Sequence, residues 1–195
     1  MKLARTTFCS LIAIALVVLA TAQTQPKRTA EVVYVPTTDA AVDAMLTLAD
    51  VKKTDVVYDL GCGDGRIVIT AAKKYGARGV GIDIDPQRIG EARENAKKAG
   101  VEHLVRFEEN DLFLADIKEA TIVTLFLLPQ LNLKLKPKLL ADLKPGTPII
   151  SNTFDMGDWK AEKEVAVNPN DQDGYSGLSN KVFRWTVPPR GSQPK

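Results

Sequence analysis

A glycine-rich segment between an apolar run and an amphipathic stretch carries the residues best suited to chemistry. Residues 59–66 read Asp-Leu-Gly-Cys-Gly-Asp-Gly-Arg. Glycines at such a turn let the backbone bend sharply and let a ligand approach where a Cβ would block it. Asp83 lies twenty residues beyond Gly63, where the next apolar run ends. A carboxylate there can accept hydrogen bonds from both hydroxyls of an adenosine ribose, so the pattern predicts a nucleoside-containing ligand.

The glycine spacing and the position of Asp59 narrow the choice of ligand. A dinucleotide-binding fingerprint requires glycine at its sixth position, which Arg66 occupies here. Asp59 stands just before the loop, where a carboxylate would repel a pyrophosphate and suit a cation. S-adenosylmethionine (SAM) carries an ammonium and a sulfonium and has no phosphate. The charge argument therefore favours SAM over NAD and makes an NAD-linked oxidoreductase the weaker alternative.

The elements that position these residues alternate between short apolar runs and amphipathic stretches. We predict strands at 56–60, 79–83, 104–107, 121–128, 147–151 and 181–187, and helices at 39–49, 66–75, 86–100 and 131–143. Asp85 is expected to cap the helix that Pro86 starts. Pro137 is expected to open a turn or break the last helix. Strand–helix–strand repetition at this spacing predicts a doubly wound, mostly parallel α/β sheet in a single domain.

The same residues resemble a known family of enzymes. The segment 59–66, Asp83 and the Asn110-Asp111 pair resemble the class I SAM-dependent methyltransferases, over about residues 31–187. The resemblance implies a Rossmann-like sheet of seven strands, with 181–187 as the candidate antiparallel strand. It also implies that Asp59 lies near the amino group of SAM, Asp83 takes the ribose, and Asp111 accepts from the adenine amino group.

The cofactor site that the resemblance implies draws on several separate segments of the chain. Its residues are Tyr34, Asp59, Gly61, Cys62, Gly63, Gly65, Asp83, Ile84, Asn110, Asp111 and Leu112. Alternatives stay open at several of these positions. Asn110 could do the work of Asp111, Asp59 could cap a turn, and Tyr34 could pack in the core. Cys62 is expected to be a small loop residue and not a nucleophile.

A closer resemblance concerns the methyl acceptor. Residues 34–37, 63–69 and 128–130 resemble the small bacterial relatives of mitochondrial protein-lysine methyltransferases. This implies methyl transfer to a protein lysine side chain, while a small-molecule methyltransferase and a non-catalytic SAM-binding module remain alternatives. The candidates for the substrate pocket are Thr37, Leu128, Pro129, Gln130, Asn152, Asp155 and Trp159. Trp159 could equally close the core, and the pattern assigns no catalytic residue.

Composition limits the other classes of function. The chain has 195 residues, 45% of them apolar, which suits one folded domain, and its net charge is only +2. A basic surface interleaved with aromatic residues is missing, so nucleic acid is an unlikely partner. His103 is the single histidine, which excludes a multi-histidine metal site, and no metal is expected.

The first residues predict a targeting segment. Lys2 and Arg5 precede an apolar run at 8–19, and small residues follow at 20–22. This is the layout of a secretory signal peptide over residues 1–22, since the run is shorter than the ~20 residues that span a bilayer. We expect an exported (periplasmic or secreted) protein after cleavage, or alternatively an uncleaved, membrane-anchored one. Residues 23–30 are expected to be a linker, 31–187 the domain, and 188–195 a disordered tail.

Overall fold

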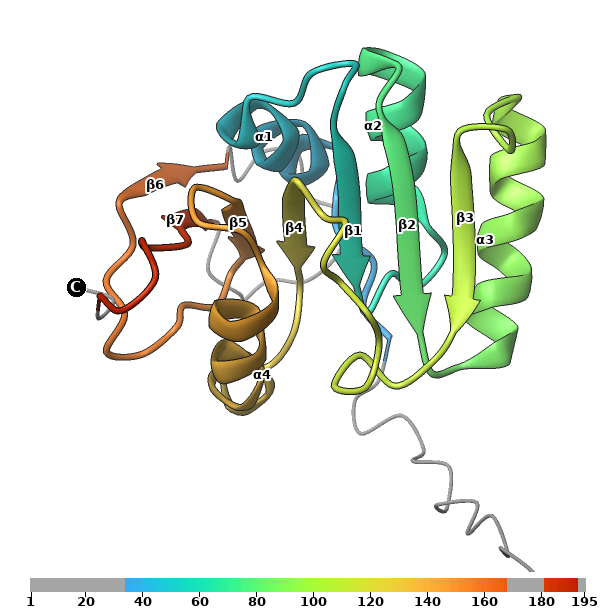
Figure 1. Ribbon diagram of the computed structural model, residues 1–195. Coiled ribbons are helices and arrows are strands. Elements are labelled where there is room, and N and C mark those ends of the chain that lie inside the picture. The colour runs from blue at the N-terminus through green and yellow to red at the C-terminus, as the bar shows by residue number, and fades with distance from the viewer. Residues whose placement is uncertain (1–33, 168–180, 193–195) are drawn as a thin grey trace, which may run out of the picture.

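The computed structural model describes residues 34–167 and 181–192, and within them the strands form one sheet. The strands are β1 (Val56–Leu60), β2 (Arg78–Asp83), β3 (Val105–Glu109), β4 (Ile122–Leu125), β5 (Pro148–Asn152), β6 (Lys163–Ala166) and β7 (Lys181–Thr186). Their order across the seven-stranded sheet is β3-β2-β1-β4-β5-β7-β6 (Figure 1). The pairs from β3 through β5 are parallel, and β7 runs antiparallel to both β5 and β6. The predicted fold class and antiparallel strand are confirmed.

The strand order reverses between β1 and β4, which places a ligand crevice there. β1 pairs in parallel with β2 on one side and with β4 on the other. In open α/β sheets, the connections on either side of such a reversal leave in opposite directions. They open a crevice outside the carboxyl ends of the strands. The glycine-rich segment follows β1 directly, so the topology brings it to this crevice.

Helices cover both faces of the sheet (Figure 1). They are α1 (Asp39–Ala49), α2 (Arg66–Tyr75), α3 (Pro86–Ala99) and α4 (Pro129–Asp142). One apolar core lies between one face of the sheet and α1, α2 and α3, and it includes Leu46, Val68 and Ile89. A second core lies between the other face and α4. The central strands are apolar on both faces for this reason.

Local signals place the ends of the helices beside the crevice. α2 follows Gly65 and ends at Gly76, both in the left-handed region of the backbone. At the start of α3 the Asp85 side chain accepts the backbone N–H of Gln87 at 2.8 Å, and Pro86 occupies the first turn. The predicted cap at Asp85 is therefore confirmed. These short connections hold the start of both helices next to the ends of β1 and β2.

The structure differs from the predicted elements in three places. β4 ends at Leu125, earlier than the expected residue 128, because the chain turns to begin α4 at Pro129. Pro137 lies inside α4 without ending it. Proline lacks a backbone N–H, so one hydrogen bond of the helix is lost. Pro137 lies on the exposed face of α4, and burial of the opposite face of α4 keeps the helix together. Strand β6 was missed because its four residues are all exposed at a sheet edge.

The ends of the described chain bear on two other expectations. The predicted signal peptide (1–22) and linker (23–30) lie outside the described residues. Among the helices within 34–167 and 181–192, none is both long and apolar enough to cross a membrane. Part of the expected tail is held against the domain, since the Arg190 guanidinium donates to the carbonyls of Leu140, Ala141 and Leu143. These carbonyls close α4 and lack partners within the helix, which explains the contact.

Candidate active site

A cavity of about 180 Å³ lies at the carboxyl ends of β1, β2, β3 and β4. Most of the predicted cofactor residues line it: Tyr34, Asp59, Gly61, Cys62, Asp83, Ile84, Asn110, Asp111 and Leu112. Of the predicted substrate-pocket residues, Thr37 lines it. The structure thus brings together residues from well-separated segments of the chain around one space.

Asp59 is a buried acid in the wall of this cavity. It lies at the end of β1, only 2% exposed, and Thr124 Oγ1 on β4 donates to its Oδ1 at 2.8 Å. Burial raises the pKa of Asp59 to about 7, the hydrogen bond from Thr124 opposes that shift, and the charges of Asp83 and Asp64 add to it. A bound cation would favour the ionised carboxylate. Asp59 is therefore suited to receive an ammonium group.

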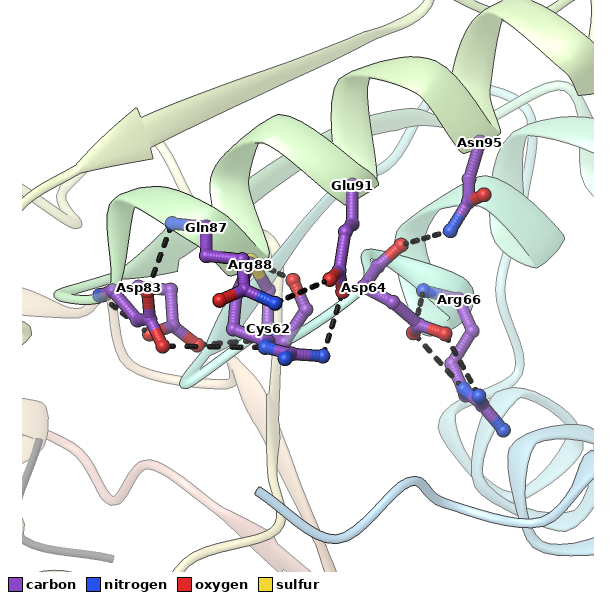
Figure 2. A network of polar contacts seen from close by, with 10 residues as sticks. Cys62, Asp64, Arg66, Asp83, Gln87, Arg88, Glu91 and Asn95 are labelled. Carbon is purple, nitrogen blue, oxygen red and sulfur yellow. Dashed lines mark hydrogen bonds and ion pairs between the residues drawn. The ribbon is translucent and has the colours of Figure 1, made fainter. Parts of the chain in front are cut away.

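Asp83 is fixed in place by the backbone around it. Its Oδ2 accepts the N–H of Gly63 at 2.8 Å and its Oδ1 accepts the N–H of Asp85 at 3.0 Å. Each carboxylate oxygen keeps a second lone pair, so the group can still accept from two ribose hydroxyls. Figure 2 shows Asp83 beside Cys62 at the start of α3. The carboxylate that the spacing predicted is oriented before any ligand arrives.

Gly63 and Gly65 shape the site without lining the cavity. Gly63 has φ +52°, and a Cβ there would lie 2.2 Å from the Tyr34 ring. At Gly65 a Cβ would meet the Phe107 ring at 2.6 Å. Both positions therefore need glycine because of neighbouring side chains, besides their left-handed backbone. The loop can pack this tightly only because these two side chains are absent.

Residues 34–37 lie against the glycine loop and contact one arginine at the start of α2 and another in α3. Arg66 Nη1 donates to the Thr37 carbonyl at 2.7 Å, and the same guanidinium makes two hydrogen bonds to the Asp64 carboxylate. The Arg88 guanidinium lies 4.6 Å from the centre of the Tyr34 ring. Burial alone would raise the pKa of Asp64, but the hydrogen bonds and charge of Arg66 hold it below its usual value.

Asp64, Arg66, Asp85 and Arg88 line the cavity but were not among the predicted site residues. Figure 2 shows Asp64 and Arg66 paired, with Asn95 of α3 directed at the backbone of Asp64. The available signal was Arg66 at the position where a dinucleotide fingerprint has glycine. Its partners lie 2 and 29 residues away in the chain, and spacing alone does not reveal the second of these.

The cavity is acidic overall and fits SAM. Five carboxylates line it, from Asp59, Asp64, Asp83, Asp85 and Asp111, against the two guanidiniums of Arg66 and Arg88. Each of the two arginines is itself paired with an acid. Ile84, Leu112 and Phe113 supply an apolar surface at the β2–β3 end, which suits an adenine ring. These acceptor groups suit a cationic nucleoside and would repel a phosphate.

Cys62 is not chemically active in this arrangement. Its side chain is buried, and burial, with the nearby charges of Asp59 and Asp83, raises the pKa of its thiol far above the usual value. A thiol is a weak nucleophile in this protonated form. Cys62 therefore acts as a small residue in the cavity wall.

The other predicted pocket residues lie outside the cavity wall. They are Leu128, Pro129, Gln130, Asn152, Asp155 and Trp159, none of which lines the space. Leu128 precedes α4, and Pro129 and Gln130 are exposed in its first turn. Trp159 is 4% exposed, with its ring 6.2 Å from that of Trp185, so it belongs to the core. In their place Phe126, Leu127 and Leu131 form the wall beyond β4.

Comparisons with known proteins agree with this geometry. The ANTKMT methyltransferase domain family matches residues 59–163. A protein-lysine N-methyltransferase from Saccharolobus islandicus is 45% identical over 155 residues, which are 79% of this chain and 92% of that protein. A solved RNA methyltransferase from Salinibacter ruber, in complex with S-adenosyl-L-homocysteine, is 54% identical with a TM-score of 0.73. That match covers 83% of this chain and 97% of the other.

More distant relatives are longer. The adenine nucleotide translocase lysine N-methyltransferase of Mus musculus is 34% identical over 131 residues, which are 67% of this chain. The match covers 56% of that protein, so this chain corresponds to about half of its length.

Proposed function

This chain belongs to the ANTKMT methyltransferase domain family, and from that premise we propose that it transfers a methyl group from SAM to a lysine side chain of a protein. It is a class I SAM-dependent methyltransferase with the mixed seven-stranded sheet of that class. The observation that carries the cofactor assignment is the buried Asp59 carboxyl in an acidic cavity. The lysine assignment is supported by relatives named for that substrate.

The chain's own residues would hold the cofactor in one orientation. Asp83 would accept from the ribose hydroxyls and Asp59 would receive the ammonium group. Asp111 Oδ1 already accepts the N–H of Phe113 at 2.8 Å, which fixes this carboxylate in the cavity wall beside the adenine surface. These groups come from the ends of three neighbouring strands, so the sheet itself sets their spacing.

Positioning and desolvation can account for most of the chemistry. SAM, when bound, supplies a methyl carbon on a sulfonium. The lone pair of the amine forms the new N–C bond while the C–S bond breaks and leaves its electrons on sulfur. The positive charge passes to nitrogen, which then loses a proton to water. Lysine must first become a neutral amine. The apolar wall of Phe126, Leu127 and Leu131 disfavours its charged form. Closing water out of the cavity aids the same step.

An extract-labelling experiment tests the function. The purified protein is incubated with methyl-labelled SAM and an extract of cells that lack it, and the products are hydrolysed and identified by mass spectrometry. We expect labelled methyl-lysine in protein. Label found only in small molecules would contradict the lysine assignment, and SAM binding without any transfer would favour a non-catalytic SAM-binding module.

Asp83→Ala provides the matched control for that experiment. It removes the acceptor for two ribose hydroxyls, which should weaken SAM binding by at least about tenfold. Labelling should fall with it at limiting SAM concentration. Calorimetry measures the SAM affinity directly, and an unchanged affinity would contradict the placement of the ribose at Asp83.

A second candidate substrate is RNA, because the Salinibacter ruber neighbour is named an RNA methyltransferase. The acidic cavity argues against it, since a phosphate backbone near these carboxylates would be repelled. The labelling experiment separates the two: ribonuclease would release an RNA product, and protease would release a protein product.

A further inference from the structure

A strained turn follows β5 beside the active site. Thr153 has φ +68°, and the N–H of Phe154 donates to the Asn152 carbonyl two residues earlier at 2.8 Å. Positive φ with this bond defines a γ-turn of the rarer, strained kind. A β-branched residue in this region is a genuine outlier, and such strain persists only where surrounding contacts impose it.

Asn132 of α4 provides those contacts. Its side-chain Nδ2 donates to the carbonyls of Phe154 and Asp155 at 3.3 and 3.2 Å, and it lies 3.4 Å from Ser151 Oγ. Asn132 is completely buried, and its Oδ1 has no hydrogen-bond partner among the described residues. A buried oxygen without a hydrogen bond destabilises the fold, and a leucine at this position would avoid that penalty. The position of this amide is therefore explained by the turn that it holds.

The strained turn also places an aromatic ring against the cavity wall. The Phe154 ring stacks on the Phe126 ring, with the ring centres 6.2 Å apart and the planes 21° from parallel. Phe126 lines the cavity and Phe154 does not. A chain of contacts thus runs from Asn132 through the turn and Phe154 to the Phe126 ring.

Phe126 lies at the end of the cavity where a methyl acceptor must arrive. Asp83 and the apolar surface for adenine are at the β2 and β3 end, and Asp59 is on β1, paired with β4. The reactive half of SAM must therefore face β1 and β4. On this side of the cavity, the segment that follows β4 contributes Phe126 and Leu127 to the wall.

We propose that Phe126 forms the aromatic wall of the lysine channel, and that Phe154 and Asn132 are positioning residues that fix the orientation of its ring. The inference rests on the proposed function. An aromatic wall packs against the aliphatic stem of lysine and, with Leu127 and Leu131, keeps water from the neutral amine. The apolar wall would thereby favour an extended alkyl amine over a carboxylate.

Phe154→Leu tests this, because it removes the stacked ring without touching the cavity wall. Methyl-lysine formation is measured at several concentrations of extract protein, and S-adenosylhomocysteine binding is measured by calorimetry. We expect kcat/KM for protein acceptors to fall by about tenfold, since small misplacements near the reacting atoms are costly. The affinity for S-adenosylhomocysteine should not change. Phe154→Tyr should restore activity because it restores the ring.

Two further variants make the result specific. Asn132→Ala should reproduce the effect of Phe154→Leu, with S-adenosylhomocysteine binding as the check that it folds. Phe183→Leu removes a ring that packs on Trp185 in β7, outside the cavity, and should behave as wild type. Wild-type acceptor kinetics in Phe154→Leu would overturn the inference, as would a parallel loss of S-adenosylhomocysteine binding. Absence of methyl-lysine from the wild-type reaction would instead reject the proposed function itself.

Discussion

Asp59 shows how one buried residue can serve binding at the expense of stability. Its pKa is about 7 in the folded chain, because burial disfavours its charge, against 3.8 for an ordinary aspartate. The folded state therefore holds this proton more tightly than the unfolded state does. Stability falls as the pH rises from about 4, where the carboxyl of the unfolded chain ionises, to about 7, above which the penalty is constant.

Asp59→Asn should therefore stabilise the protein while it abolishes tight SAM binding. The amide oxygen can still accept from Thr124 Oγ1, and no charge is buried. The gain should be small near pH 4 and should grow to at most about 4 kcal/mol above pH 7, from about 1.4 kcal/mol per pKa unit. Urea denaturation at both pH values measures it. A variant less stable than wild type at pH 8 would contradict the buried-charge explanation.

The same carboxyl should make SAM binding depend on pH. Below pH 7 the free site is protonated, and the ammonium of the ligand favours the charged form, so binding must release a proton. Affinity should fall as the pH drops from 7.5 to 5.5, with a limiting slope of about tenfold per pH unit. Calorimetry in buffers of different ionisation enthalpy measures both the affinity and the proton released. In Asp59→Asn the residual affinity should lack this slope, and a flat profile in wild type would count against the assignment.

At the scale of elements, α4 holds the acceptor end of the site while carrying an unfavourable residue. Leu131, Leu135 and Leu139 are buried against the sheet, and Asn132 beside them holds the turn after β5. Pro137 is exposed inside the same helix and cannot donate to the carbonyl of Leu133. The sequence pattern correctly predicted a helix here but overestimated the effect of proline, because tertiary burial outweighs one lost hydrogen bond.

Pro137→Ala should stabilise α4. It restores the missing N–H and replaces the residue with the best helix former, so we expect a gain of roughly 1–3 kcal/mol in the free energy of unfolding. Pro137→Gly restores the N–H without the propensity and should gain less. Thermal and urea denaturation of both variants measure the difference. A destabilised alanine variant would mean that the proline ring makes packing contacts that its exposure does not suggest.

At the scale of the whole molecule, two cores support the sheet from its two faces, and each also contributes residues to the cavity wall. The core beside α4 includes Trp159 and Trp185, and the Trp185 indole N–H donates to the Trp159 carbonyl at 2.8 Å. Trp159 was a candidate pocket residue, yet it joins the segment after β5 to β7. In an irregular segment, the sequence pattern does not distinguish a tryptophan of the core from one that lines a pocket, because its neighbours in space are not known.

Trp159→Ala should therefore reduce stability and leave the folded protein's affinity for SAM unchanged. Removing so large a buried side chain should cost about 3–5 kcal/mol, and Trp159→Phe should cost less. Denaturation curves and SAM calorimetry on the same samples measure both effects. An intact melting temperature with weakened SAM binding would return Trp159 to the site.

The parts of this protein that depend on local chemistry could be predicted from the order of its residues. The strand–glycine–helix segment, the acid twenty residues later and the cap at Asp85 follow from rules about neighbouring residues, and they predicted the fold class and a cationic nucleoside ligand. Three features became visible only in the folded chain: Arg66 ties Thr37 to the glycine loop, Phe126 stacks on Phe154, and burial raises the pKa of Asp59 to about 7. These features arise from burial and from contacts between residues distant in the chain, which spacing along the sequence does not encode.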